Sequence, residues 1–268
     1  SAYGDQGLYS LAEDASDLAK RPTTFIDVQF VQAAGLDFVR NTETDSVAGV
    51  LGGGACVLDY DADDDVDIFL TDGGNTAGRL YRNLGNGAFD DVTASVDISV
   101  PGPGIGCTAG DYDNDERIDL AVGTPEGVTL LRNTGLGVFE DMSATTGIDI
   151  GRTDAGIPIG LTFVDFDHDT DLDLYIVRSN GLAVEGNQIL SQAESAAGNM
   201  LWRNNGNGTF TDWTSETGLG GVASSIGAVG TDINNDRAID LVLTGWGNSP
   251  EIFLNPRTGE FDRLDWTG

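Results

Sequence analysis

Residues Asp59-Tyr-Asp-Ala-Asp-Asp-Asp-Val-Asp67 place six carboxylates in nine positions, directly before the apolar run Ile68-Phe69-Leu70. An apolar run of this kind is typical of a buried strand. The carboxylates before it repel one another unless something neutralises them. The stretch therefore raises two questions: which fold requires it, and what balances its charge.

The acidic stretch occurs four times in the chain. The other copies begin at Asp111, Asp165 and Asp232, at offsets of 52, 54 and 67 residues. Each copy has acids or an amide at positions 1, 3, 5 and 9. A second motif follows each copy, as Leu80-Tyr-Arg-Asn-Leu-Gly-Asn-Gly-Ala-Phe89 in the first and in worn form at Ile252–Phe261 in the last. The chain thus contains four copies of one unit of about 50 residues.

Each unit reads as four short strands. A Gly-rich apolar segment such as Val50–Leu58 predicts a first strand that packs closely against other backbone. The acidic loop then reverses the chain, and the apolar run after it predicts the second strand. Leu-Tyr-Arg-Asn predicts the third strand, Asn-Gly-Asn-Gly a hairpin turn, and the segment that begins with Phe the fourth strand.

Four short antiparallel strands repeated at this period are typical of propeller blades. We therefore predict an all-β fold, a β-propeller of four-stranded antiparallel blades, with four recognisable blades and an N-terminal partial blade. Residues 1–22 are expected to form an N-terminal extension, and 23–40 an orphan outer strand. The propeller domain is expected at 23–268, with blades at about 49–93, 105–143, 157–214 and 226–265.

Composition excludes several classes of function. The formal net charge of -31 makes nucleic acid and anionic membrane surfaces poor partners. The longest apolar stretch, about Gly49 to Leu58, is far shorter than the roughly 20 residues that span a bilayer. We do not expect an enzyme, because one histidine and two cysteines supply neither a Ser/His/Asp set nor a zinc cluster. A glycosidase that uses paired carboxylates is the alternative, although the acidic loops account for most of the carboxylates.

The spacing of the acids suggests what balances their charge. Oxygens at positions 1, 3, 5, 7 and 9 of a tight loop can converge on one point, as in calcium-binding loops. Two carboxylates about 4 Å apart repel by on the order of 1 to 4 kcal/mol between bulk water and a protein surface. Calcium is favoured over magnesium because the loop offers many protein oxygens and no phosphate. The alternative is a solvated acidic turn, which four copies in register make less attractive.

The two linked motifs resemble the FG-GAP or VCBS repeats of integrin α-subunit propellers and their bacterial relatives, over about residues 23–265. The lead-in Phe25-Ile-Asp-Val28 with Ala34-Gly-Leu36 resembles the branch of cartilage acidic protein and UnbV-associated proteins. The resemblance implies calcium in a loop between the first two strands of each blade, about four ions here. It also implies an extracellular adhesion or scaffolding role, often on seven blades.

The same resemblance implies a ligand set, carried over position by position. The implied side-chain ligands are Asp59, Asp61, Asp63 and Asp67; Asp111, Asp113, Asp115 and Asp119; Asp165, Asp167, Asp169 and Asp173; and Asp232, Asn234, Asp236 and Asp240. The implied carbonyl ligands are those of Asp65, Arg117, Asp171 and Ala238.

Two features depart from the family pattern. Glycine is usual at loop position 6, where Asp64, Glu116, Thr170 and Arg237 stand here, so these loops are expected to be strained or differently shaped. Four units and an orphan strand do not make a seven-bladed ring, so the ring is either small or part of something larger. An open edge invites pairing with another chain.

Single residues add further expectations. Cys56 and Cys107 precede two loops on neighbouring first strands, so a disulfide near the axis is predicted, with two separate buried thiols as the alternative. Trp246, between two glycines, is a candidate for stacking on a sugar or anchoring a protein. The third unit carries an insertion at 179–197, which is either functional or a surface excursion.

Together these features predict an extracytoplasmic calcium-binding propeller that acts as a protein-binding, adhesion or scaffold module. Calcium sites of extracellular modules have dissociation constants of about 0.1 to 1 mM, which suits a secreted, periplasmic or cell-surface location. A lectin-like module that binds carbohydrate is one alternative. A structural subunit of a surface assembly, joined through an open edge, is another.

Overall fold

The strands of the computed structural model form four antiparallel four-stranded sheets and one separate two-stranded sheet, β11 with β12. The residues that it describes are 33–38, 49–50, 53–72, 78–135, 137–150, 156–179, 182–185, 188–191, 198–221, 225–245 and 249–264. Within these ranges no sheet closes on itself. The predicted all-β fold is confirmed, and each four-stranded sheet is called a blade below.

The blades follow the order of the four sequence units. Blade 1 comprises β1 (Ala55–Leu58), β2 (Asp67–Leu70), β3 (Arg79–Asn83) and β4 (Phe89–Asp91). Blade 2 comprises β5 (Gly106–Gly110), β6 (Asp119–Thr124), β7 (Gly127–Asn133) and β8 (Phe139–Asp141). Blade 3 comprises β9 (Ile157–Val164), β10 (Asp173–Ser179), β13 (Met200–Asn204) and β14 (Phe210–Asp212). Blade 4 comprises β15 (Ser225–Thr231), β16 (Asp240–Gly245), β17 (Glu251–Leu254) and β18 (Asp262–Arg263).

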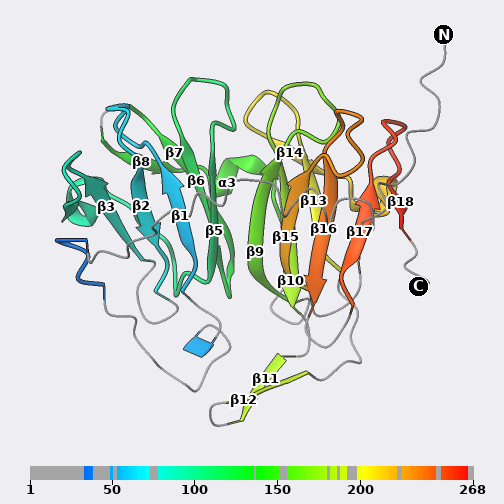
Figure 1. Cartoon of the computed structure of the whole chain (residues 1–268), viewed down its shortest axis with the longest axis horizontal. Coiled ribbons are helices and arrows are strands. Elements are labelled where there is room, and N and C mark those ends of the chain that lie inside the picture. The colour runs from blue at the N-terminus through cyan, green and yellow to red at the C-terminus, as the bar shows by residue number, and fades with distance from the viewer. Residues whose placement is uncertain are drawn as a thin grey trace, which may run out of the picture. The chain divides into compact units, whose positions relative to one another are not determined.

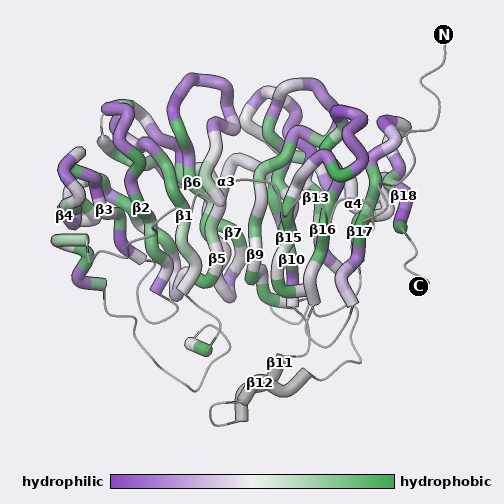
Figure 2. The backbone as a smooth tube through the Cα atoms, viewed as in Figure 1, coloured by the Kyte–Doolittle hydropathy of each residue, from purple (hydrophilic) through white to green (hydrophobic). Residues whose placement is uncertain are grey.

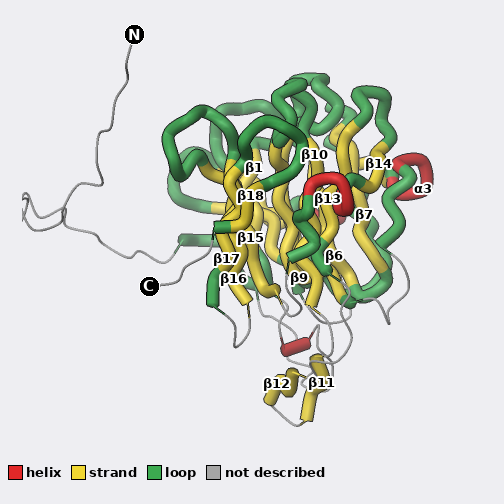
Figure 3. Tube along the Cα trace, turned by 90° about the vertical axis from the view of Figure 1, so that its right-hand side faces the viewer, coloured by secondary structure: helices red, strands yellow, loops and turns green. Residues whose placement is uncertain are grey.

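The blades stand side by side in sequence order (Figure 1). The first strand of each blade contacts the first strand of the next blade, in the order β1, β5, β9 and β15. Small residues permit this approach: a Cβ on Gly106 of β5 would lie 2.5 Å from the carbonyl oxygen of Ile159 in β9. Short helical turns follow the outer strands, as Figure 3 shows for α3. They are η1 (Thr93–Ser95), α3 (Ser143–Thr146) and α4 (Thr214–Thr217).

The hydrophobic core is divided into three layers, one between each pair of neighbouring blades. Phe69 and Leu120 belong to the layer between blades 1 and 2, and Tyr175 and Leu241 to the layer between blades 3 and 4. Because blades 2 and 3 are covered on both faces, their second strands β6 and β10 are buried along their whole length. The alternation of apolar and polar residues therefore gives way to an uninterrupted apolar run in the middle of each strand, Leu120–Val122 in β6 and Leu174–Val177 in β10.

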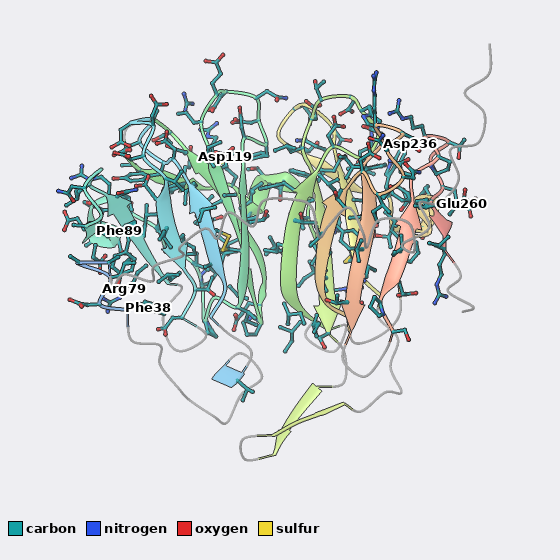
Figure 4. All side chains as sticks on the ribbon, viewed as in Figure 1. Phe38, Arg79, Phe89, Asp119, Asp236 and Glu260 are labelled. Atoms are coloured by element: carbon teal, nitrogen blue, oxygen red, sulfur yellow. A yellow bond between two sulfur atoms is a disulfide. The ribbon has the colours of Figure 1, made fainter. Side chains whose placement is uncertain are left out.

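The predicted disulfide is present. Cys56 of β1 and Cys107 of β5 are joined across the first two blades, at a sequence separation of 51 (yellow bond in Figure 4). Structural disulfides persist in oxidising compartments and are rare in the cytosol of most organisms. The bond thus supports the expectation of an oxidising location. No helix among the described residues is long and apolar enough to cross a membrane.

The structure describes part of the predicted N-terminal strand and of the insertion. Of residues 1–40, only 33–38 are described, and the backbone N–H of Phe89 donates to the carbonyl of Ala34 at 2.8 Å. The predicted extension 1–22 lies outside the described residues. The insertion contains the hairpin of β11 (Leu182–Glu185) and β12 (Gln188–Ser191), separate from blade 3.

The disulfide makes a measurable contribution to stability. Replacing Cys56 and Cys107 together by serine is expected to lower the free energy of unfolding by about 4 kcal/mol, because the unfolded chain regains the entropy of a loop of this length. Denaturant unfolding with and without reductant measures this. Reduced wild type should match the double variant, and a midpoint unaffected by either change would contradict the expectation.

Candidate metal centres

The four acidic stretches form loops at one end of the blades. Loops 1 to 4 are residues 59–67, 111–119, 165–173 and 232–240, and each joins the first strand of its blade to the second. They lie at the top of Figure 1, where the chain is mostly hydrophilic (Figure 2). Figure 4 places Asp119 of loop 2 and Asp236 of loop 4 at this end. In each blade, the pair that closes the loop is the residue before it and the aspartate at position 9, as in Leu58 with Asp67.

All four loops follow the same backbone path. The residues at position 4 have φ of 58°, 59°, 63° and 62°, and those at position 6 have φ of 68°, 67°, 77° and 71°. The position-6 residues Asp64, Glu116, Thr170 and Arg237 therefore take the left-handed conformation for which the family uses glycine. The loop keeps its shape and bears the strain, which is roughly 1 to 2 kcal/mol for each non-glycine residue.

The carboxylate at position 1 holds the turn closed in three of the loops. Asp59 accepts hydrogen bonds from the backbone N–H groups of Asp63 and Asp64, both at 3.1 Å. Asp111 and Asp232 make the same pair of bonds to positions 5 and 6 of their loops, at 2.9 to 3.0 Å. This is the local bonding by which aspartate favours turns over regular structure.

The carboxylate at position 9 is the most buried group of each loop. Asp67, Asp119, Asp173 and Asp240 are each 0% exposed. In loop 2, Asp119 accepts from the N–H of Tyr112 at 3.1 Å and from the N–H of Asn133, in β7, at 2.8 Å. The other three loops repeat both bonds at 2.7 to 3.2 Å. Position 9 thus fastens the loop to the third strand of its blade.

Burial makes the charged form of these groups costly in the absence of a cation. Desolvation raises the pKa of Asp119 to about 7 and that of Asp173 to about 8, although two backbone N–H groups act against it in each case. Desolvation, followed by the neighbouring carboxylates Asp63 and Asp59, also raises the pKa of Asp61. The loops therefore hold negative charge that protons or a cation must balance.

Carboxylate oxygens converge in three of the four loops. The groups with one oxygen from each residue within 4.8 Å of the others are Asp59, Asp61 and Asp67; Asp111, Asp113 and Asp115; and Asp165, Asp167 and Asp173. Two residues of these groups, Asp113 and Asp165, each have an Oδ1 that is buried without a hydrogen-bond partner among the described atoms. Buried unpaired acceptors are rare and call for an explanation. A calcium ion would supply one, because it binds six to eight oxygens.

Some of the predicted ligands are not in these groups. The aspartate at position 5 belongs to a converging group only in loop 2. There the group contains Asp115 and not the aspartate at position 9, Asp119. Within the described residues, loop 4 shows no such acidic group, and its amide Asn234 donates to Asp236 at 2.9 Å. The carbonyl ligands at Asp65, Arg117, Asp171 and Ala238 stay predictions, as do the remaining members of the ligand set.

Arginine side chains reach the loops, which the sequence analysis did not consider. Arg203 of β13 donates from Nε to Asp167 at 2.6 Å and from Nη2 to Asp169 at 2.7 Å. Arg117 of loop 2 forms an ion pair with Asp115. The signal was present in the sequence, because Arg82, Arg132 and Arg203 precede the third-strand asparagine in three units. An arginine can partly neutralise a loop that holds no cation, and it competes with a cation for the same oxygens.

Comparison of the sequence with models of known protein families finds the repeated unit again. A family described as FG-GAP-like repeat matches residues 59–122 and 111–176, and each match begins at the first aspartate of a loop. Residues 59–176 therefore contain two FG-GAP-like repeats, which supports the predicted resemblance to the FG-GAP/VCBS repeat family. The resemblance to the cartilage acidic protein branch rests on residues 25–36, outside these matches, and stays a prediction. No curated protein matches the sequence.

Two solved structures are similar to part of the chain. One is an Agrocybe aegerita lectin described as recognising non-reducing terminal N-acetylglucosamine, at 19% identity and a TM-score of 0.46, over 77% of this chain and 49% of the lectin chain. The other is the Photorhabdus luminescens Tc holotoxin pore, at 18% identity and a TM-score of 0.40, over 73% of this chain and 8% of that chain. The chain thus spans less than half of either relative, and no function is transferred from them.

The raised aspartate pKa values predict how stability depends on pH. Without metal, the folded state keeps protons on Asp119 and Asp173 up to about pH 7 and 8, whereas the unfolded state releases them near pH 4. Because the folded state binds more protons in this window, the free energy of unfolding should fall as pH rises from about 4 to 8. Denaturant titrations in chelator measure this.

The variant Asp90→Asn, which removes an exposed carboxylate, is the control. Its free energy of unfolding should depend on pH in the same way as that of wild type. Stability that rises across the same window in metal-free protein would contradict the assignment of burial as the dominant cause.

Proposed function

We propose that loops 1, 2 and 3 bind calcium ions, and that these ions hold the loops and thereby the blades in place. The observation that carries the proposal is the convergence of three carboxylates in each loop, together with the unpaired buried Oδ1 atoms of Asp113 and Asp165. When bound, the ion supplies positive charge and oxygen coordination, and no redox or Lewis-acid step is part of the proposal. The side chains that hold it are the three groups of aspartates named above.

The donor chemistry favours calcium over other occupants. All donors in the three groups are carboxylate oxygens, which suit hard cations, and no histidine or cysteine takes part. Magnesium would demand stricter octahedral geometry and keeps several waters. Protons alone would neutralise the most buried aspartates only below the pH at which they titrate, and Arg203 reaches loop 3 alone. Loop 4 keeps its calcium site as a prediction from sequence.

We further propose that the chain is a binding module of an extracytoplasmic protein, and not an enzyme. The disulfide supports an oxidising location. The single histidine, His168, is exposed at position 4 of loop 3. The end of the blades that bears the four acidic loops, called the acidic face below, is the candidate contact surface. Two of its loops are joined directly, because Asn114 of loop 2 donates to Asp171 of loop 3 at 2.6 Å.

A protein partner is the preferred occupant of that face. Between blades 2 and 3 it contains a polar hollow of about 270 Å³, lined by Tyr112, Asp113, Arg132 and Asn204 among others. Polar and charged side chains of this kind suit a hydrophilic protein surface and repel anionic membranes and nucleic acid. The carbohydrate alternative rests on Trp246, which lies outside the described residues and stays a prediction.

Calcium binding is tested by calorimetric titration and by melting with and without chelator. We expect at least three ions per chain, one in each of loops 1, 2 and 3, with a fourth if loop 4 binds as the sequence predicts. The expected dissociation constants are about 0.1 to 1 mM, and the expected stabilisation is roughly 2.7 kcal/mol per site when calcium exceeds the dissociation constant a hundredfold. Asp113→Asn and Asp165→Asn should each remove one ion from the count. The exposed Asp90→Asn is the matched control and should bind as many ions as wild type.

The proposal fails if calcium releases no heat and leaves the melting midpoint unchanged. It also fails if Asp113→Asn and Asp165→Asn bind as many ions as wild type, because the ions would then lie elsewhere.

A further inference from the structure

Loop 3 is held by a side chain from outside the loop. Arg203 of β13 donates from Nε to Oδ2 of Asp167 at 2.6 Å and from Nη2 to Oδ2 of Asp169 at 2.7 Å. This pair of bonds is called the arginine clamp below. The other oxygen of each carboxylate accepts a backbone N–H of the loop, from Asp169 at 3.3 Å and from Asp171 at 3.0 Å. All four carboxylate oxygens at positions 3 and 5 of loop 3 therefore already accept hydrogen bonds.

The carboxylate at position 1 of loop 3 differs from its counterparts in the other loops. Asp59, Asp111 and Asp232 each accept two backbone N–H groups of their own loop. Between described residues no such bond reaches Asp165, and its Oδ1 is buried without a partner. Loop 3 thus follows the same backbone path with the arginine clamp in place of the position-1 bonds.

The arginines at the same strand position in blades 1 and 2 do not clamp their loops. Arg132 of blade 2 forms its ion pair with Glu140 of the fourth strand, and its Nε is buried without a partner among the described residues. Nε of Arg82 in blade 1 is buried without a partner as well. Within loop 2, Arg117 pairs with a single carboxylate, that of Asp115. Among the described residues of loops 1 to 3, two carboxylates are bound to one guanidinium in loop 3 alone.

A tryptophan offers the guanidinium of Arg203 a second contact. Cζ of Arg203 lies 5.1 Å from the centroid of the Trp213 ring. Trp213, directly after β14, also packs against Phe166 of loop 3, with 6.1 Å between the ring centroids. A cation within about 6 Å of a tryptophan ring is attracted to the face of the ring. The guanidinium can therefore release both carboxylates and remain over Trp213.

We propose that Arg203 makes loop 3 a weaker calcium site than loop 1, so that loop 3 fills only as the calcium concentration rises further. This inference rests on the calcium binding proposed above. The oxygens that an ion in loop 3 would use at positions 3 and 5 face the guanidinium, and two positive groups at this distance repel each other. Arg203 therefore has to leave Asp167 and Asp169 when an ion enters.

The expected size of the effect follows from the bonds that are lost. One charge-assisted hydrogen bond corresponds to about a tenfold change in affinity, so the dissociation constant of loop 3 should be about tenfold above that of loop 1. Loop 3 then has two closed arrangements, one held by Arg203 and one held by an ion. It responds to the calcium concentration, whereas loop 1 stays occupied.

Calorimetric titration of Arg203→Gln with calcium tests the proposal. The glutamine removes the positive charge and keeps a polar side chain, and circular dichroism checks that the variant is folded. It should bind as many ions as wild type, with one dissociation constant lowered about tenfold. Adding Asp165→Asn should remove this site, which assigns it to loop 3. Arg132→Gln, the same change at the same strand position of blade 2, is the matched control and should leave every dissociation constant unchanged.

Two further variants separate the clamp from a structural role of the side chain. Calcium should change the tryptophan emission of wild type as loop 3 fills, because the guanidinium over Trp213 loses its carboxylates. Trp213→Phe, which keeps an aromatic ring beside Phe166, should remove this change. Arg203→Lys keeps the charge without the planar fork, so its affinity for calcium should lie between those of wild type and Arg203→Gln.

The proposal is overturned if Arg203→Gln leaves all dissociation constants as in wild type or weakens the binding of an ion. An emission of Trp213 that stays the same while loop 3 fills also overturns it. The absence of binding heat in wild type and in every variant is a separate outcome, which refutes the calcium binding itself and with it this inference.

Discussion

The buried carboxylate at loop position 9 is the interaction on which the rest of the structure depends. It has no exposed surface, and its two oxygens bind the backbone of position 2 and the backbone of the third-strand asparagine. In blades 2 to 4, that asparagine then donates its side-chain amide to the loop of the preceding blade. One acidic residue per unit thus orients its own loop, its own sheet and the contact with the next sheet. Replacing it by an apolar residue would leave two buried N–H groups unpaired in each blade.

The acidic loops follow from this arrangement and from the net charge that it creates. A carboxylate buried at the end of a strand attracts positive charge, and the further aspartates at positions 1 to 5 surround the same point with oxygens. Without a cation, desolvation and then the neighbouring carboxylates raise the pKa of Asp61, and the loop aspartates engage arginines such as Arg203. With one, the same oxygens become ligands. The strain at position 6 is tolerable for the same reason, because a loop fixed by so many bonds has no easy alternative conformation.

Much of this could be predicted from the sequence because the unit repeats. Four copies of the loop and of the hairpin motif fixed the strand order, and the places of Cys56 and Cys107 before two of the loops pointed to the disulfide. The spacing did not reveal that the aspartate at position 9 accepts hydrogen bonds from two backbone N–H groups. An aspartate that binds a metal and one that accepts hydrogen bonds cannot be told apart in the sequence. Arg203 was missed because it is a strand residue that reaches its loop only after folding. The exposure of Ile233 could not be predicted either, because Ile233 and the buried Tyr60 occupy equivalent positions in their loops.

The central claim, that cations occupy the loops of blades 1 to 3, is tested most directly by anomalous diffraction from crystals grown in excess calcium. The account predicts a peak in each of loops 1, 2 and 3, within bonding distance of Oδ1 of Asp113 in loop 2 and of Asp165 in loop 3. Loops that keep the same closed conformation in such crystals without any peak would contradict it, because the carboxylates would then be balanced by protons and arginine alone.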